Sequence, residues 1–375
     1  MRTGVGAGMI GGVGAIVVVT GAGGPVGRQA IATIAADPGV SRVVAVDVAL
    51  DPAARVHGVG GADVRVAPFA LDDPRLAIAL AGASVLVHLG PVSGPELDGT
   101  GGTGVDLDGF ACLLDVVEAV GCVDHLVVLS SGLVYGSRDD NPVPLTETAA
   151  VRPHPRVGMA VAKARLETMA GAWAFDHGAT CTILRPSLVV SASNGRWLSR
   201  SPWSTTGLQV RGVEPPVQFL HVDDLAAAVG VVLTTRVEGA VNVAPDGWLA
   251  AHQLRALKGP TWRLRLPRRT AYTLASVGLL LGSGRGSPDE LLAGTGPWVL
   301  ANDRLRALGW EPGYTSAEAF VEADTGGPWA RLTPRHRQAI ALGAGVSVVL
   351  GGLGVVAGLV FRRRRRRPPT ARRPG

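Results

Sequence analysis

The chain has 375 residues, 47% of them hydrophobic and 18% charged, which is enough to bury one large hydrophobic core or two smaller ones. Its 52 glycines follow no Gly-X-Y period and lie among long apolar runs, which excludes a collagen-like chain and general disorder. The three cysteines form no C-x-x-C pair, so neither a disulfide framework nor a cysteine zinc site is expected, and a reducing compartment fits. The net charge of +6 comes from eight arginines in residues 362–375. The remaining residues together carry a net charge of −2, which argues against a nucleic-acid partner.

Short apolar runs predict buried parallel strands at residues 16–20, 42–47, 64–67, 84–89, 125–130 and 180–184. Helical patterns lie between them, at residues 25–36, 73–81, 106–120 and 157–176. Strands that alternate with helices of this length predict right-handed βαβ units. We therefore expect an α/β fold, in which helices cover both faces of a parallel sheet.

A glycine-rich turn follows the first predicted strand. Residues 20–28 read TGAGGPVGR, with Gly21, Gly24 and Gly27 three residues apart and a predicted helix after them. Such glycines let the backbone turn tightly and approach a ligand, and the free N–H groups of the helix N-terminus favour a pyrophosphate. Asp47 lies 20 residues beyond Gly27, at the end of the second predicted strand, where a carboxylate accepts hydrogen bonds from the adenine ribose. The same carboxylate would repel a 2′-phosphate, and no arginine follows it in VDVAL, so the sequence favours NAD over NADP.

The second half of the chain is built differently, because all eight tryptophans lie at or after Trp173. We expect a smaller lobe there, with a strand at 239–243 and a helix near 270–282. The apolar run 271–284 is short for a membrane span and is expected to be a core helix. Trp173 and Phe175 are also expected in the core.

A cluster of residue types that can bind a metal occurs at His221, Asp223 and Asp224. It lies where a helix is predicted to start. The pattern favours Asp223 as the cap of that helix, so no metal site is predicted.

Residues 339–361 form an apolar run of 23 residues without a charge. About 20 helical residues cross a hydrocarbon core about 30 Å thick, so this run is expected to be a transmembrane helix, and a buried core helix is the alternative. Small residues recur on one face, at Gly343, Ser347 and Gly351. Such spacing would allow two helices to pack closely in a homodimer.

Two rules give opposite orientations for this span. Residues 1–14 contain no recognisable secretory signal, which favours a body that faces the cytoplasm and meets NAD there. The excess of arginine after the span favours a cytoplasmic tail instead. A re-entrant hairpin with its tail on anionic membrane lipid would satisfy both rules, and the sequence leaves the side of the tail open.

Six further segments occur in a characteristic order: VLVHLG at 85–90, LVVLSSGLVYG at 126–136, ILRPS at 183–187, FLHVDDLA at 219–226, VNVAPDG at 241–247 and LGWEPGYT at 308–315. With the glycine-rich turn, they make residues 16–314 resemble the extended short-chain dehydrogenases/reductases, the NAD-dependent epimerase/dehydratase group. The resemblance implies a Rossmann-type doubly wound parallel sheet that binds NAD and a smaller C-terminal substrate lobe. The predicted organisation is a flexible lead at 1–14, an NAD-binding domain at 15–186, a substrate lobe at 187–330 with segments that return to the sheet, a linker at 331–338, a transmembrane helix at 339–361 and an arginine-rich tail at 362–375.

The resemblance also implies which residues form the site. Ser131, four residues before the Tyr of VYG, matches the family's catalytic serine. Lys163 matches the lysine of its Tyr-x-x-x-Lys pair, which binds the nicotinamide ribose and lowers the pKa of the tyrosine. The chain has only two lysines among its 36 basic residues, so a lysine at this position indicates that its ammonium group is needed. The implied cofactor-binding residues are Gly21, Gly24, Pro25, Val26, Gly27, Asp47, Phe69, His88, Leu89, Gly90, Lys163 and Pro186.

Three positions depart from the family pattern. Met159 stands four residues before Lys163, where the family has its catalytic tyrosine. A thioether neither donates nor accepts a proton usefully, and loss of a general acid or base typically costs about 10²–10⁴-fold in rate. Phe69 replaces an acid that meets the adenine, and Asp106 replaces an asparagine at a helix start.

The sequence leaves two functions open. The first is a membrane-anchored NAD-dependent oxidoreductase or epimerase that acts on a nucleotide-sugar, lipid-linked sugar or sterol-like substrate. Ser131 would hold the reacting oxygen and Lys163 would move the proton, directly or through water. A 4,6-dehydratase is disfavoured, because Gly132 and Leu133 follow the serine where that group has Asp-Glu. The second function is a non-catalytic NAD-binding membrane scaffold or redox sensor, for which Met159 argues.

Overall fold

Valine-rich strands form a seven-stranded sheet in the computed structural model of the chain, which describes residues 14–50, 61–90, 105–192, 207–258, 263–280 and 288–323. The strands are β1 (Ala15–Thr20), β2 (Val40–Val46), β3 (Asp63–Ala67), β4 (Val85–His88), β5 (His125–Leu129), β6 (Thr180–Pro186) and β10 (Gly239–Val243). Their order across the sheet is β10-β6-β5-β4-β1-β2-β3, and all neighbours run parallel. The predicted α/β fold with a Rossmann-like parallel sheet is confirmed.

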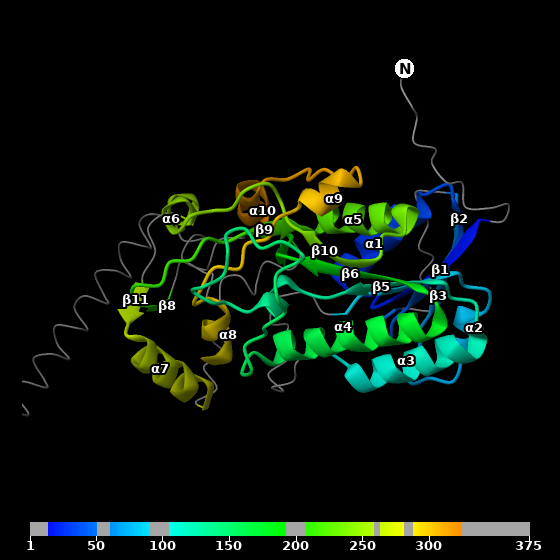
Figure 1. Cartoon of the computed structure of the whole chain (residues 1–375), viewed down its shortest axis with the longest axis horizontal. Coiled ribbons are helices and arrows are strands. Elements are labelled where there is room, and N and C mark those ends of the chain that lie inside the picture. The colour runs from blue at the N-terminus through cyan, green and yellow to red at the C-terminus, as the bar shows by residue number, and fades with distance from the viewer. Residues whose placement is uncertain are drawn as a thin grey trace, which may run out of the picture. The chain divides into compact units, whose positions relative to one another are not determined.

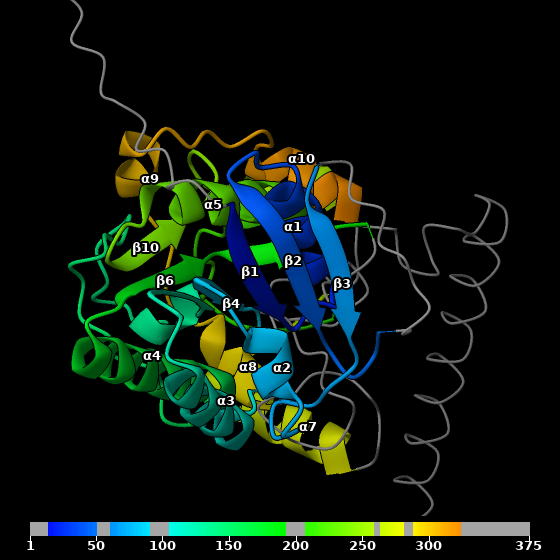
Figure 2. The same ribbon diagram turned by 90° about the vertical axis from the view of Figure 1, so that its right-hand side faces the viewer.

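Helices cover both faces of this sheet, so its strands are apolar on both sides. Along β1, Val17 and Val19 point into one buried core and Val18 points into the other. Figures 1 and 2 show α1 (Pro25–Ala35) and α5 (Val222–Thr235) on one face. They show α2 (Leu76–Leu80), α3 (Leu107–Val120) and α4 (Gly158–His177) on the other.

The order of the strands reverses at β1, which lies between β2 and β4. Thr20, the last residue of β1, lies opposite Val46 on one side and His88 on the other. In open α/β sheets, ligands bind beyond the carboxyl ends of the strands at such a switch point. The ends of β1 and β4 are therefore where a ligand site is expected.

Residues after β6 form two small parallel pairs, β7 (Leu188–Val190) with β9 (Phe219–His221) and β8 (Gly207–Val210) with β11 (Arg263–Leu266). Five more helices follow in this part: α6 (Ala251–Lys258), α7 (Arg268–Leu280), α8 (Pro288–Ala293), α9 (Asp303–Ala307) and α10 (Ser316–Ala323). A third hydrophobic core holds this part together around Tyr135, Trp298 and Phe320. The division predicted at residue 186 stays a prediction.

By its contacts the chain divides into two units, Met1–Thr325 and Gly326–Gly375. The second unit lies outside the described residues, and so do the predicted transmembrane helix at 339–361 and the arginine-rich tail. Among the helices that are described, none combines the length and the apolar character that crossing a bilayer requires. The membrane span therefore stays a prediction.

One of the two aromatic side chains predicted for the core is in fact exposed. Trp173 is buried and shares a face of α4 with Leu166 and Ala170, whereas Phe175 is 87% exposed. Residues two apart on a helix point about 200° away from each other, so the face that buries Trp173 turns Phe175 to the surface. The prediction for Phe175 is wrong.

The core helix predicted at 271–284 is wrong for the residues whose burial is described, and the rest of that run lies outside them. Between residues 268 and 277 of α7, only Ala271 is buried, and Leu274 and Val277 are 46% and 44% exposed. The helix contacts β8, β11 and α8. Apolar composition predicted that a helix forms here, but not how many of its faces would be covered.

The start of α5 is where the sequence predicts it, but the cap is a different residue. His221 is the N-cap, and its Nδ1 accepts a hydrogen bond of 3.3 Å from the backbone N–H of Asp223. Because α5 begins at Val222, Asp223 lies in the first turn, where the helix dipole favours a carboxylate. Asp224 instead accepts hydrogen bonds from the N–H groups of Gly313 (2.7 Å) and Tyr314 (3.1 Å).

Candidate functional site

The glycines of the turn after β1 play different structural roles. Gly21 has a φ of +73°, and a Cβ there would lie 1.6 Å from the carbonyl oxygen of Leu89. A Cβ on Gly27 would lie 2.3 Å from the Gly21 carbonyl oxygen, so the close approach of α1 to the turn requires glycine. At Gly24 the nearest protein atom would be 3.7 Å away, so the protein itself leaves room there. Gly24 is also the N-cap of α1 and offers no side chain to its N–H groups.

The first two residues of α1 place no polar side chain at the helix N-terminus. Pro25 begins the helix, where its missing N–H costs nothing, and Val26 is buried in the core. The backbone N–H groups that follow the proline, those of Val26 and Gly27, therefore remain for an anion at the helix N-terminus. That arrangement fits the pyrophosphate of a dinucleotide.

Asp47 follows β2 and ties it to the glycine-rich turn. One carboxylate oxygen accepts a hydrogen bond of 3.0 Å from the N–H of Gly23, and the other accepts one of 2.9 Å from Ala49. Arg28 on α1 donates a hydrogen bond from Nη1 to the carbonyl oxygen of the same glycine. A guanidinium and a carboxylate thus both bind Gly23, and the sequence predicted only the carboxylate.

His88 and Leu89 join the end of β4 to the end of β1. The backbone N–H of Leu89 donates to the carbonyl oxygen of Thr20 (3.0 Å), and Nδ1 of His88 lies 2.8 Å from the Thr20 hydroxyl oxygen. The His88 ring is buried against Phe110, with ring centroids 4.6 Å apart. Burial, and after it the charge of Lys163, lower the pKa of His88 to about 3, so the imidazole is neutral at pH 7.

Lys163 lies on α4, and its side chain is completely buried. Its Nζ donates a hydrogen bond of 2.6 Å to the carbonyl oxygen of Leu129, the last residue of β5. Burial lowers the pKa of Lys163 from 10.5 to about 7, against the smaller opposite effect of Glu167. A Cβ on Gly90 would lie 3.1 Å from Nζ, so the amine faces the chain just after β4. At neutral pH, both the amine and the ammonium form are populated.

Ser131 is fully buried two residues beyond the acceptor of Lys163. It caps a short 3₁₀ helix, η1 (Gly132–Tyr135), and its Oγ accepts a hydrogen bond of 3.2 Å from a backbone N–H of that helix. A Cβ on the first residue of η1 would lie 3.2 Å from the carbonyl oxygen of Pro186, at the end of β6. The ends of β5 and β6 therefore bring Ser131, Lys163 and Pro186 to the same edge of the sheet.

Met159 is half-buried in the first turn of α4, one helical turn before Lys163. The chain has three tyrosines, and none of them lies on α4. Tyr135 is buried, and its hydroxyl donates to Oδ1 of Asn242 over 2.8 Å. Met159 therefore places a thioether, and not a hydroxyl, one helical turn before Lys163.

The other two departures have different consequences. Phe69 is half-buried just after β3, and the guanidinium carbon of Arg75 lies 4.4 Å from its ring centroid. Asp106 is the N-cap of α3 and accepts a hydrogen bond of 2.8 Å from the N–H of Gly109. Since aspartate and asparagine cap helices about equally well, the second replacement preserves the helix start.

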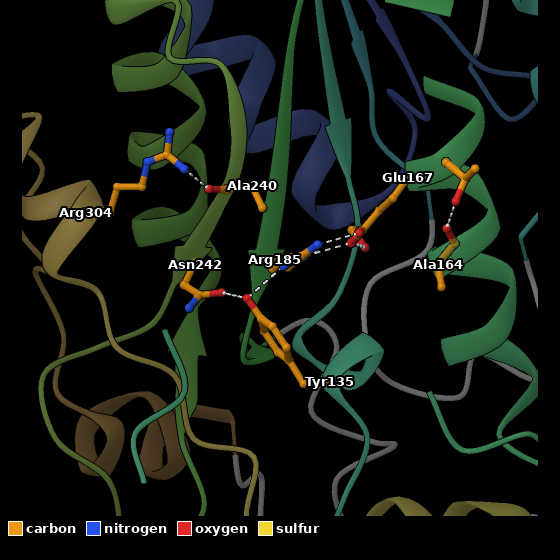
Figure 3. Close-up of polar contacts among 9 residues, drawn as sticks. Tyr135, Ala164, Glu167, Arg185, Ala240, Asn242 and Arg304 are labelled. Carbon is orange, nitrogen blue, oxygen red and sulfur yellow. Dashed lines mark hydrogen bonds and ion pairs between the residues drawn. The ribbon is translucent and has the colours of Figure 1, made fainter. Parts of the chain in front are cut away.

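A buried polar network that the sequence did not predict lies behind the site. Figure 3 shows Arg185 of β6 between Glu167 of α4 and the hydroxyl of Tyr135. Nε and Nη2 of Arg185 donate to the two carboxylate oxygens of Glu167 over 3.0 and 2.7 Å, and Nη1 donates to Tyr135 over 2.9 Å. The hydroxyl of Ser130 donates to the same carboxylate. The spacing of Glu167 four residues after Lys163 was the only available signal, and it does not show that a guanidinium lies opposite.

The chain is similar to known proteins in its sequence and in its fold. The model of the NAD dependent epimerase/dehydratase family matches residues 17–244. The fold is similar to that of the Thermus thermophilus UDP-glucose 4-epimerase solved with NAD, with a TM-score of 0.60, 19% identity, and coverage of 82% of this chain and 97% of that one. It is also similar to MoeE5 solved with UDP-glucuronic acid and NAD (TM-score 0.61, 18% identity, 82% and 97% coverage).

A third similar fold is the dTDP-glucose 4,6-dehydratase of Bacillus anthracis str. Ames in complex with NAD, with a TM-score of 0.57, 15% identity, and coverage of 82% of this chain and 95% of that one. No curated protein sequence matches the chain closely enough to serve as a relative. At identities this low, the structural likeness establishes the fold alone. The family model covers more than half of the sequence, and the chain belongs to the NAD dependent epimerase/dehydratase family.

Proposed function

We propose that the chain binds NAD at the carboxyl ends of β1 and β4 and acts as an oxidoreductase or epimerase on an alcohol or ketone group of a nucleotide-sugar, lipid-linked sugar or sterol-like substrate. The observation that carries this proposal is Lys163, a fully buried amine that faces Gly90 and has a pKa of about 7. A structural lysine would not need to be desolvated at the switch point of a parallel sheet. Perturbed pKa values of this kind are typical of catalytic sites.

The residues present fit a dinucleotide. Gly24 leaves the N-terminus of α1 open, and Asp47 stands at the end of β2 with both carboxylate oxygens near the turn. We commit to NAD rather than NADP, because the carboxylate would repel a 2′-phosphate. Phe69 and Arg75 would form the wall next to the adenine, and Pro186 the wall next to the nicotinamide.

The chemistry proposed for the protein itself is proton transfer. NAD, when bound, supplies a hydride acceptor for oxidation and a donor for reduction. Ser131 would hold the substrate oxygen, and the neutral amine of Lys163 would take the proton that leaves an alcohol as it is oxidised, directly or through one water. The ammonium form would return that proton when a ketone is reduced. Lys163 would thereby perform the task of the tyrosine that Met159 replaces.

A nucleotide-sugar substrate is supported by the names of similar folds, which include UDP-glucuronic acid, UDP-glucose and dTDP-glucose. We propose a nucleotide sugar, a lipid-linked sugar or a sterol-like alcohol as the substrate. A 4,6-dehydratase is less well supported, because Gly132 and Leu133 follow Ser131.

Binding and turnover test this proposal separately. NADH fluorescence titration should show binding that Asp47→Ala weakens for NAD more than for NADP, and an equal loss for both would contradict the choice of NAD. Oxidation of a substrate panel followed at 340 nm should depend on Ser131 and Lys163. Full turnover by Lys163→Ala would contradict the proposed proton transfer.

A second function is favoured by one observation, the thioether of Met159 at the acid/base position. A scaffold or redox sensor that binds NAD without turnover needs the glycine-rich turn and Asp47, but no proton donor. Met159→Tyr distinguishes the two functions. A gain of activity from an inactive protein would favour the scaffold, whereas loss of an existing activity would favour a mechanism built on Lys163.

We further propose that the protein is anchored by a single span at residues 339–361, with its body facing the cytoplasm, and that membrane lipid or a second copy packs against this span. The length and apolar character of the run support the anchor. Protein that is washed off membranes by high pH would contradict it. Protease added to right-side-out vesicles should spare residues 1–330, and their digestion would contradict the cytoplasmic body.

A further inference from the structure

Glu167 is a carboxylate buried inside the fold, one helical turn after Lys163 on α4. It is 7% exposed, and its two main partners, Arg185 and Ser130, are 6% and 0% exposed. The two-point pair with Arg185 joins α4 to β6 over 2.7 and 3.0 Å. Burying such a pair costs desolvation free energy that hydrophobic residues of similar size would avoid, so stability alone gives little reason for it.

The second partner of Glu167, Ser130, connects it to the site. Ser130, whose hydroxyl donates to Oε1, lies between Leu129 and Ser131 in the chain. Leu129 supplies the carbonyl oxygen that holds Lys163, and Ser131 is the candidate that holds the substrate oxygen. One carboxylate therefore fixes the strand end that carries both of these contacts.

We propose that Glu167 is a positioning residue of the reaction: with Arg185 as its counter-ion, it holds the end of β5 so that Ser131 and Lys163 face the same substrate oxygen. The assignment of these two groups rests on the proposed function. The hydrogen bonds of Glu167 with Arg185 and Ser130 establish the position of the carboxylate independently of that function.

This arrangement also sets the charge near the amine. The titratable groups around Lys163 are Glu167 on its own helix, His88 on β4, which is neutral, and Arg185 on β6, reached through Glu167. The guanidinium of Arg185 offsets part of the charge of Glu167 while the two are paired, and Glu167 still raises the pKa of Lys163. Removing one of them leaves the opposite charge uncompensated beside Lys163, so the two removals should act on its protonation in opposite directions. A role limited to packing would not produce opposite signs.

The protein allows a direct measurement, because it has only two lysines. The full chain, labelled with ¹³C at lysine Cε and held in detergent micelles, should give two signals, and Lys258→Arg identifies the one from Lys163. In Glu167→Gln, the midpoint of the Lys163 titration should fall by about one pH unit or more, since the unpaired guanidinium repels the ammonium. In Arg185→Gln, the midpoint should rise by a similar amount, since the unpaired carboxylate attracts it.

Two more variants keep the test decisive. Ser130→Ala removes only one hydroxyl donor from the carboxylate and leaves no buried charge unpaired, so it should fold and raise the midpoint by less than Arg185→Gln does. Tyr135→Phe removes the far end of the network and should leave the midpoint within about 0.3 pH units of wild type. Shifts of the same sign in Glu167→Gln and Arg185→Gln, or no shift in Ser130→Ala, would overturn the proposal.

The outcome is separable from that of the proposed function. A protein that binds no NAD, and whose Lys163 midpoint still moves in opposite directions, would refute the oxidoreductase but keep the coupling of Glu167 to the amine. A protein that turns over substrate, and whose midpoint does not respond to Glu167→Gln, would keep the oxidoreductase and refute the positioning role. In an active protein, Glu167→Gln should also move the pH dependence of kcat in the same direction as the titration midpoint.

Discussion

Two of the motif glycines after β1, Gly24 and Gly21, are expected to cause different losses when they are replaced. Gly24→Val meets no protein atom closer than about 3.7 Å at its Cβ, so the fold should remain and NADH binding should be lost where the pyrophosphate approaches. Gly21→Val places a Cβ 1.6 Å from the Leu89 carbonyl oxygen at a positive φ, so it should destabilise the whole domain. Circular dichroism with NADH titration checks both. A folded Gly24→Val protein that binds NADH normally would contradict the assigned site.

Replacing Lys163 by arginine conserves the positive charge, and we still expect turnover to be lost. Lys163→Arg places a guanidinium that cannot lose its proton near neutral pH in a fully buried site, so turnover should fall by about 100-fold or more. Lys258→Arg, the matched change at the other lysine, should keep wild-type turnover. Steady-state kinetics on the two variants checks this. Equal activity in both would show that Lys163 acts only as a positive charge.

The candidate site could be predicted only where the neighbours of a residue in the chain indicate its role. Gly21, Gly27 and Asp47 were predictable because a turn and a strand end fix their surroundings locally. The pairing of Glu167 with Arg185 was not, because it joins α4 to β6 across residues that lie 18 apart in the chain. Arg28 was missed for a similar reason, since its side chain folds back five residues to Gly23.

At the scale of elements, the sequence predicts where strands and helices lie better than which of their faces are covered. The strand expected at 239–243 has those bounds in the structure, and the helix expected at 157–176 is shifted by one residue. Buried parallel strands are uniformly apolar, so their positions can be recognised as apolar runs in the sequence alone. The exposed side of α7 and the exposed Phe175 depend on neighbours from other parts of the chain, which periodicity does not contain.

At the start of α5, two adjacent aspartates should differ in how much they contribute to stability. Asp224→Ala leaves the N–H groups of Gly313 and Tyr314 without their buried acceptor, so the free energy of unfolding should fall by about 2–4 kcal/mol. Asp223→Ala removes a partly exposed carboxylate from the first turn and should cost about 0.5 kcal/mol. Urea denaturation of the two variants checks the difference. Similar losses would mean that Asp224 does not anchor the segment after α9.

At the scale of the whole molecule, two buried histidines make the fold sensitive to acid. Burial lowers the pKa of His88 to about 3 and that of His125 to about 4, whereas histidine in an unfolded chain titrates near 6.5. Between about pH 4 and 6.5, the unfolded chain therefore binds more protons than the folded one. The free energy of unfolding should fall as the pH drops through this window, by up to about 1.4 kcal/mol per pH unit for each histidine.

Chemical denaturation at a series of pH values between 4 and 8 measures this slope, and replacement of single histidines assigns it. His125→Gln can keep a hydrogen bond to the Thr182 hydroxyl and removes one of the two protons, so its unfolding free energy should fall less steeply with acid than that of the wild type. His177 is the opposite case, because a hydrogen bond to the Trp173 carbonyl raises its pKa in the folded state. The folded chain takes up this proton above pH 6.5, between the unfolded pKa and the raised one. The His177→Gln variant should therefore lose a gain in unfolding free energy as the pH falls toward 6.5, and keep the wild-type slope between pH 4 and 6.5. A His125→Gln curve parallel to that of the wild type between pH 4 and 6.5 would mean that the buried imidazoles do not govern the acid limit of this fold.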